Sequence, residues 1–198
     1  EAAGFEGKVG QPHTWPSTGR VLALVGIGAA KDVDGNAVRA TGASIGRSFG
    51  RHARIGISLP VSELNDSATR QALAEGVMLS TYTYTAYKSD AKPTKLAKVD
   101  IAGASGARAQ TALDRGAALA AGQCFARDLV NEPGGDLTPA AFARRLSAMA
   151  KSAGLTAKVW DEAAIKKAKL GGLLGVNRGS TNPPRLVELT YSPKGKAT

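Results

Sequence analysis

Apart from the carboxylates, only three side chains in this sequence are thiols or imidazoles, the groups that serve as metal ligands, nucleophiles and general bases. They are Cys124 and the histidines His13 and His52. A catalytic cysteine needs a base partner, and a metal site needs several ligands at close spacing. The histidines lie in different predicted elements with no cysteine or paired carboxylates nearby, and Cys124 lies on the apolar stripe of a predicted helix. We therefore predict structural or surface roles for the histidines and burial for Cys124.

The carboxylates in the last third of the chain are Asp136, Asp161, Glu162 and Glu188. Hydrolysis by a pair of metal ions needs several carboxylates that converge on ions roughly 3.5–4 Å apart. Asp161 is placed to cap a helix and Glu162 to lie in its first turn, whereas Glu188 falls on a strand and Asp136 in a loop. Nothing in their spacing brings them together. We therefore assign no catalytic, cofactor-binding or metal-binding residue in this chain.

Two glycine-rich segments are candidate phosphate or anion sites. Gly26-Ile27-Gly28 follows a predicted strand, as in a dinucleotide-binding fingerprint, but Lys31 stands where that motif needs a third glycine. We predict an ordinary turn there. The segment Gly171–Gly179 is compatible with an anion cradle of backbone N–H groups. It is equally compatible with a tight connection between a helix and a strand.

Aromatic and basic clusters suggest contact with nucleic acid. Tyr82, Tyr84 and Tyr87, close to Lys88, could stack on bases. We predict that one helix carries these tyrosines and that they pack at a domain edge instead. A second cluster lies on a short predicted helix and is typical of a solvated face: Lys166, Lys167 and Lys169.

The elements that must position these residues alternate between strands and helices. Strands are predicted at 20–28, 55–59 and 97–102, and helices at 37–49, 66–87 and 110–129. The continuous apolar run Arg20–Gly28 is typical of a strand buried on both faces of a parallel sheet. In the first helix Gly42, Gly46 and Gly50 recur every fourth residue and would let a neighbouring backbone approach closely. This order predicts an open α/β sheet with helices on its faces.

A second unit begins after the break Asn131–Gly135, which reads NEPGG. Thr138 is placed to cap a helix with Pro139 at its first position, and Gly154 to end it. A strand at 155–160, a helix capped by Asp161 and a strand at 185–191 follow. The predicted fold is therefore α/β. An N-terminal open α/β sheet domain (1–109) is joined by a long helix and a boundary loop (110–135) to the first α/β elements of an incomplete domain (136–198).

Composition limits the broad class of protein. The chain has 198 residues and one cysteine, which excludes an internal disulfide and favours a reducing compartment. No apolar run approaches the roughly 20 residues of a membrane span. The first residues lack the basic and apolar regions of a signal peptide. We expect a cytoplasmic protein that has no membrane partner.

The net charge of +10 is unevenly distributed. Residues 1–135 carry 15 Lys/Arg and 12 Asp/Glu, whereas residues 136–198 carry 11 and 4. Because the excess lies mainly outside the first domain, we expect only weak, salt-sensitive nucleic-acid binding without sequence preference. A non-catalytic basic α/β module that binds nucleic acid or a partner remains the alternative function.

Two segments carry a resemblance to a known family. They are ARDLVNEPGGDLTPAAFA at 126–143 and GGLLGVNRGSTNPPRLVELTYSP at 171–193. The first is similar to the segment that joins the two domains of M17 leucyl aminopeptidases, and the second resembles the next signature of that family. Earlier segments resemble the family's N-terminal domain more loosely: FEGKVGQ, RVLALVGIG and AEG…YTAYK. The chain is thus identified as an N-terminal domain plus the start of a catalytic domain.

The resemblance implies a cytosolic, hexameric metallopeptidase that removes N-terminal residues, often leucine, from peptides. In the family, two divalent ions (zinc or manganese) are held by a lysine and several Asp/Glu residues, and an arginine is catalytic. Their Gly-Lys-Gly-x-x-Phe-Asp-Ser-Gly-Gly and Asn-Thr-Asp-Ala-Glu-Gly-Arg segments do not occur here, and Lys194-Gly195-Lys196 is not the first of them. We expect this chain to start inside the family's N-terminal domain at Glu1, to hold no metal and to be inactive alone. Its partner would be the remainder of the catalytic domain, on the same or a separate chain.

Overall fold

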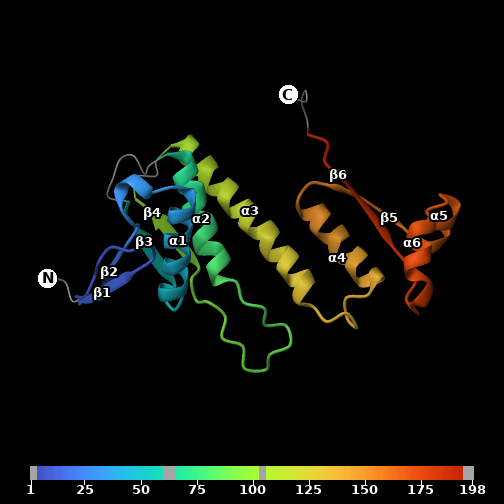
Figure 1. Cartoon of the computed structure of the whole chain (residues 1–198), viewed down its shortest axis with the longest axis horizontal. Helices are drawn as coiled ribbons and strands as arrows, with labels where there is room; N and C mark the ends of the chain where they lie inside the picture. The colour runs from blue at the N-terminus through green and yellow to red at the C-terminus, as the bar shows by residue number, and fades with distance from the viewer. Residues whose placement is uncertain (1–3, 60–65, 103–105, 194–198) are drawn as a thin grey trace. The chain divides into compact units, whose positions relative to one another are not determined.

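The chain folds into two compact units, Glu1–Asp128 and Leu129–Thr198. The computed structural model describes residues 4–59, 66–102 and 106–193, and Figure 1 shows the order of their helices and strands. In the described residues the first unit combines helices with two two-stranded sheets and the second combines them with one, which confirms the predicted α/β class. Among the described residues, no helix has both the length and the apolar character needed to cross a membrane. The terminal Lys194-Gly195-Lys196 lies outside the described residues.

Two capped helices form the centre of the first unit. Helices α1 (Gly35–Phe49) and α2 (Ser67–Thr81) begin directly after Asp34 and Asp66. Each carboxylate accepts a hydrogen bond from the backbone N–H three residues later, at 2.8 and 2.7 Å respectively. Such a cap satisfies a donor that the first helical turn leaves unpaired. Both helices therefore start close to the positions that their local sequence predicts.

Glycines bring the backbones of α1 and α2 together. A Cβ atom added at Gly42 would lie 2.7 Å from the carbonyl oxygen of Leu73, and one at Gly46 would lie 2.8 Å from that of Val77. These two positions confirm the close approach predicted from the glycine repeat. Gly50 differs, because an added Cβ would meet the Gly46 carbonyl oxygen of its own helix at 2.8 Å. Gly50 thus ends α1 and does not contact α2.

The core of the first unit lies between these helices and a short parallel sheet. Strands β3 (Arg54–Ile57) and β4 (Lys98–Ile101) pair in parallel, with Arg54 opposite Lys98. Both strands fall where the sequence predicts them. Their apolar side chains pack on α1 and α2, and the buried members of this cluster are Val38, Ile45, Phe49, Ile57, Ala72, Leu73 and Val77.

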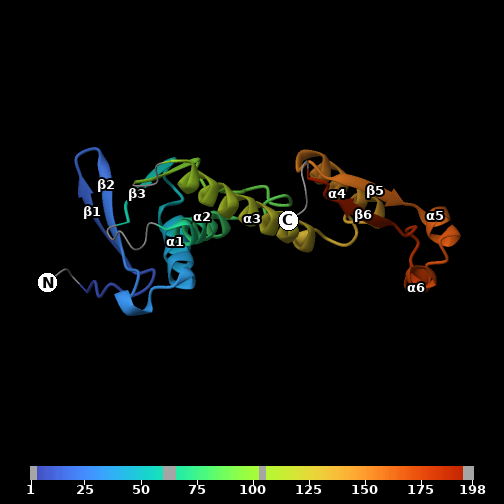
Figure 2. The ribbon, with the colours of Figure 1, turned by 90° about the horizontal axis from the view of Figure 1, so that it is seen from above.

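The apolar run at 20–28 has a different environment from the predicted one. Strand β2 (Arg20–Val25) pairs antiparallel with β1 (Pro12–Ser17), which the sequence analysis did not predict, across a turn in which Gly19 has φ +70°. Val21 and Leu24 are 46% and 51% exposed. Figure 2 shows the hairpin extending away from the helices. The predicted burial on both faces of a parallel sheet is therefore wrong, because an apolar run indicates a strand without specifying its neighbours.

Helix α2 ends earlier than predicted. Its last residue is Thr81, and Tyr82 is already extended, with φ −64° and ψ 130°. Alternating threonine and tyrosine from residue 81 lowers the helix propensity, because β-branched and aromatic side chains lose rotamer freedom in a helix. Tyr84 and Tyr87 lie in the loop that follows, with ring centroids 6.1 Å apart. The prediction that one helix carries all three tyrosines is wrong.

The second unit follows the predicted order. Thr138 caps α4, and Gly154 with φ +70° follows its end. Strands β5 and β6 pair antiparallel, with Trp160 opposite Leu186. The segment Gly171–Gly179 consists of short helical turns, which favours the connection and not the anion cradle. The elements are α4 (Pro139–Ser152), β5 (Thr156–Trp160), α5 (Glu162–Lys167), α6 (Gly171–Val176), the 3-10 turn η3 (Asn177–Gly179) and β6 (Leu186–Thr190).

A buried acid, Glu75, links α2 to its neighbours. It is 7% exposed, and it accepts hydrogen bonds from Arg39 Nε at 2.7 Å and Gln71 Nε2 at 2.8 Å. Burial by itself raises the pKa of Glu75. The hydrogen bonds from Gln71 and Arg39 and the charges of Arg39 and Arg115 outweigh burial and hold this pKa below its usual value. The ionised carboxylate is therefore the form that stabilises the folded unit.

We expect Glu75→Gln to lower the free energy of unfolding by about 1–3 kcal/mol at neutral pH, because it removes a charged acceptor from a buried network. A lowered folded-state pKa gives stability that is present above the unfolded pKa and lost as pH falls through the folded pKa. The difference in the free energy of unfolding between Glu75→Gln and the parent protein should therefore shrink below about pH 4.3. Urea unfolding across this range measures it, with Asp90→Asn in an exposed loop as control. A difference that does not change with pH would contradict an ionised Glu75.

Candidate functional site

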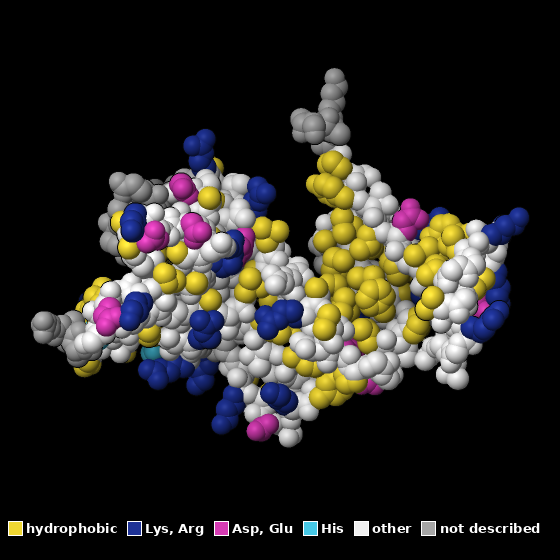
Figure 3. Space-filling view, in the orientation of Figure 1, with side chains coloured by type: hydrophobic (Ala, Val, Ile, Leu, Met, Phe, Trp, Pro, Cys, Tyr) yellow, Lys and Arg dark blue, Asp and Glu magenta, His cyan; other side chains and the backbone are white. Residues whose placement is uncertain are grey.

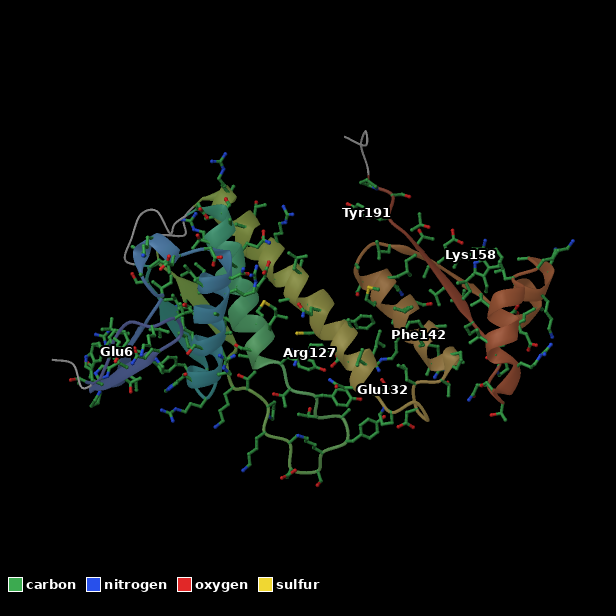
Figure 4. All side chains as sticks on the ribbon, in the orientation of Figure 1. Glu6, Arg127, Glu132, Phe142, Lys158 and Tyr191 are labelled. Carbon is green, nitrogen blue, oxygen red and sulfur yellow. The ribbon has the colours of Figure 1, made fainter. Side chains whose placement is uncertain are left out.

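The most specific sequence motif begins on helix α3 (Ala107–Asn131), which confirms the long helix predicted at 110–129 and extends it at both ends. The Arg127 guanidinium lies 3.9 Å from the ring centroid of Tyr82, and its Nη1 donates a hydrogen bond to the Leu79 carbonyl at 3.2 Å. The Tyr82 hydroxyl donates to Asp128 Oδ1 at 2.8 Å. Figure 4 labels Arg127 in the last turns of α3. These contacts of Arg127 and Asp128 hold the end of α3 against the end of α2.

The turn after α3 is held by contacts within the second unit. The backbone N–H groups of Asp136 and Leu137 both donate to the Pro133 carbonyl at 2.9 Å. Glu132 forms an ion pair with Arg145 of α4, and its side chain is only 16% exposed. These contacts tie the turn at 132–137 to α4 within the second unit.

Cys124 is half-buried, which corrects the prediction that it is fully buried. The predicted stripe consists of Leu113, Ala117, Ala120 and Cys124. Of these only Ala120 is buried, and the other three are half-buried. Burial is the main cause that raises the pKa of the Cys124 thiol; the charge of Asp128 adds to the rise and that of Arg127 opposes it. A raised pKa disfavours the thiolate, which is the nucleophilic form. This shift favours the protonated thiol.

Both histidines lie beside aromatic rings. The centroid of the His13 ring lies 6.0 Å from that of Phe5 and 5.7 Å from that of Trp15. The ring of His52 lies 6.5 Å from that of Phe49. Within the described residues, no group of three or more His, Cys, Asp or Glu side chains could hold a metal ion.

The carboxylates of the second unit have separate local roles. Asp161 Oδ1 accepts a hydrogen bond from the N–H of Ala164 at 2.8 Å and caps α5, as predicted. Glu162 pairs with Lys166 at 2.6 Å, one turn further along the same helix. Glu188 on β6 lies 3.9 Å from Lys158 on β5. Each of these three acids thus contacts a lysine or a helix N-terminus close to it, and they do not converge on a common point where a metal ion could bind.

The second unit exposes a group of apolar side chains. Figure 3 shows hydrophobic side chains gathered over α4 and β6. Phe142 and Leu189 are 38% and 39% exposed, and Val159 and Tyr191 are 45% and 69% exposed. Val159 pairs with Val187 in the register, so one face of the β5–β6 sheet is apolar. A large exposed apolar patch marks a surface that packs against further protein.

The two halves of the chain match two domains of one family in their natural order. Residues 1–91 match the N-terminal domain of the cytosol aminopeptidase family, and residues 124–198 match the catalytic domain of the same family. The chain is 35% identical to a probable cytosol aminopeptidase of Rippkaea orientalis and 36% identical to one of Streptomyces coelicolor. These alignments cover 98% of this chain but 41% and 42% of the two relatives.

Solved structures agree in fold. The bottromycin maturation enzyme BotP in complex with Mn is 38% identical, with a TM-score of 0.83 over 96% of this chain and 41% of that chain. A mutant of tomato leucine aminopeptidase has a TM-score of 0.85 at 24% identity, over 98% of this chain and 40% of that chain. The chain thus spans about two fifths of the length of the proteins it matches. It belongs to the cytosol aminopeptidase (M17) family and carries the N-terminal domain and the first part of the catalytic domain.

Proposed function

We propose that this chain is the front part of a cytosolic, metal-dependent leucyl aminopeptidase that removes N-terminal residues from peptides. Residues 1–109 would form its N-terminal domain, 110–135 the linker helix and boundary loop, and 136–198 the start of the catalytic domain. The observation that carries this proposal is the match to two domains of one family in chain order. The names of the relatives, probable cytosol aminopeptidases, support both the activity and the cytoplasmic location.

The metal ions that the family implies do not fit the described residues. Two ions that activate water and polarise a peptide carbonyl need a shared set of carboxylates. Here no such group exists among the described residues, and the acids of the second unit are engaged in local contacts. We infer that the metal ligands and catalytic residues lie in a part of the protein outside these 198 residues. The manganese in the BotP structure supports divalent metal use in the complete enzyme.

The apolar surface of the second unit is where we expect that remaining part to pack. One face of the β5–β6 sheet presents Val159 and Leu189, both more than a third exposed. A two-stranded hairpin is marginally stable by itself, and further strands or helices are needed to bury its apolar face. Completion of the domain would cover these side chains. Assembly into a hexamer is a further expectation from the family.

The test is a peptidase assay of residues 1–198 alone. We expect no turnover of a leucine-anilide substrate with added Mn²⁺ or Zn²⁺ and no stoichiometric metal by elemental analysis. A complete enzyme of the family serves as the positive control. Adding the remainder of the catalytic domain should restore metal-dependent turnover. Turnover by residues 1–198 alone would show that the active site lies within this chain, and failure of the reconstituted protein to act on any peptide would overturn the enzyme assignment.

A further inference from the structure

The first unit contains an open groove of about 480 Å³ between α2, β4 and α3. Figures 1 and 2 both show α2 and α3 side by side. Most of the lining residues are apolar, and they include Val77, Met78, Val99, Ile101, Leu113 and Ala117. Sites for small molecules are typically of this size and combine a mainly apolar lining with a few polar groups.

Helix α3 has two adjoining faces with different roles in this unit. The buried face consists of small residues, which are Ala109, Ala112, Gly116 and Ala120. It packs closely on α2, because a Cβ added at Gly116 would lie 2.5 Å from the Gln71 carbonyl oxygen. The groove face lies roughly a quarter of a turn further around the helix and consists of Gln110, Leu113, Asp114 and Ala117. One face of α3 thus makes the contact with α2, and the next face lines the groove.

Asp114 places a carboxylate at the outer rim of the groove. It is exposed, and of the groove face it lies furthest around the helix from the buried face. Its Oδ1 accepts a hydrogen bond from Gln110 Nε2 at 2.7 Å, one turn earlier on the same face, and within the described part of the chain it forms no ion pair. Lys98 pairs with Asp100 on the face of β4 opposite to the groove. A negative charge without a paired cation therefore lies beside an apolar floor.

We propose that this groove binds a small primary amine with an aliphatic body. The ligand ammonium pairs with the Asp114 carboxylate, and the aliphatic body lies on Leu113 and the apolar side chains of α2 and β4. A charge-assisted hydrogen bond fixes the orientation, and burial of the aliphatic body adds affinity. An aliphatic carboxylate is disfavoured, because its charge would meet the like charge of Asp114. The groove lies in the first unit and is independent of the peptidase assignment, so binding is measured without any activity assay.

The experiment titrates residues 1–198 with four probes and follows backbone amide NMR shifts. The probes are hexylamine, hexan-1-ol without a charge, hexanoate with the opposite charge, and ethylamine with a much shorter aliphatic body. We expect hexylamine to bind in the millimolar range, with shifts in α2, β4 and α3. Hexan-1-ol and ethylamine should each bind roughly tenfold more weakly, which corresponds to the loss of about 1.4 kcal/mol. Hexanoate should bind more weakly than hexan-1-ol.

Variants of Asp114 test the role of its charge. Asp114→Asn keeps a side-chain oxygen that can accept the Gln110 hydrogen bond. It should lower the affinity for hexylamine to that for hexan-1-ol and leave the affinity for hexan-1-ol unchanged. Asp114→Lys should reverse the preference, so that hexanoate binds more tightly than hexylamine. The matched control is Asp90→Asn, which removes the same charge from an exposed position outside the groove and should change neither affinity.

Two variants of α3 test the location of the site. Ala117→Trp should fill the groove and abolish the hexylamine shifts, whereas Ala118→Trp at an exposed position of the same helix should leave them unchanged. Three results would each overturn the proposal: no saturable binding of hexylamine, equal affinity for hexylamine and hexan-1-ol, or hexylamine binding that Asp114→Asn leaves unchanged. Hexylamine shifts that survive Ala117→Trp would also overturn it, because the ligand would then lie elsewhere.

Discussion

Gly76→Ala is expected to destabilise the first unit by about 3 kcal/mol, although alanine is the better helix former. An added Cβ would overlap the carbonyl oxygen of Arg39 and would lie 2.9 Å from the backbone N of Ala43. These neighbours are backbone atoms of α1 and cannot move as the end of a side chain can. The two helices would have to separate, and the buried cluster that contains Val38 and Leu73 would lose packing between them.

The control is Gly122→Ala on α3, where an added Cβ meets nothing within 4 Å. That substitution should stabilise the protein by about 0.5–1 kcal/mol, because glycine in a helix costs backbone entropy. The same change in two helices is therefore expected to have opposite signs. Urea unfolding followed by far-ultraviolet circular dichroism measures both. A stabilising effect at Gly76 would contradict the close approach of α1 and α2.

Features fixed by a few neighbouring residues were predictable from the sequence. The predicted helix caps at Thr138 and Asp161 both form, because a cap needs only its own side chain and the N–H groups of the next turn. The glycine spacing in α1 also predicted a close backbone contact, since only a missing Cβ permits it. Neither inference depends on knowing the partner element.

Features that depend on distant residues were not predictable. The bond between Tyr82 and Asp128 joins positions far apart in the chain, and the early end of α2 that places Tyr82 there was missed. The hairpin of β1 and β2 was missed because Pro12 and Pro16 hide the first strand, although both prolines suit an edge strand. In the candidate site, the sequence identified the Arg127-Asp128 motif by resemblance but contained no signal for its contacts.

Ile165→Ala is expected to unfold the second unit while the first unit remains folded. Ile165 is 0% exposed, and the other buried apolar side chains in the described part of this unit are all smaller: Ala141, Ala143, Ala150 and Pro184. Truncation of a fully buried isoleucine costs about 2–5 kcal/mol, including the cavity that remains. A small core gives only a small free energy of unfolding, so a loss of this size is enough to unfold the unit.

The two tryptophans allow the units to be followed separately, because Trp15 lies on β1 and Trp160 on β5. In a Trp15→Phe background, fluorescence reports only the second unit, and urea unfolding of that unit should shift to a much lower midpoint with Ile165→Ala. The matched control is Val176→Ala at a position that is 91% exposed, where a change within about 0.5 kcal/mol is expected. In a Trp160→Phe background, the signal of Trp15 should be the same with isoleucine or alanine at position 165. If both tryptophan signals showed the same drop in urea midpoint, the two units would unfold together. If Ile165→Ala kept the midpoint of the parent, Ile165 would not be the centre of the second core.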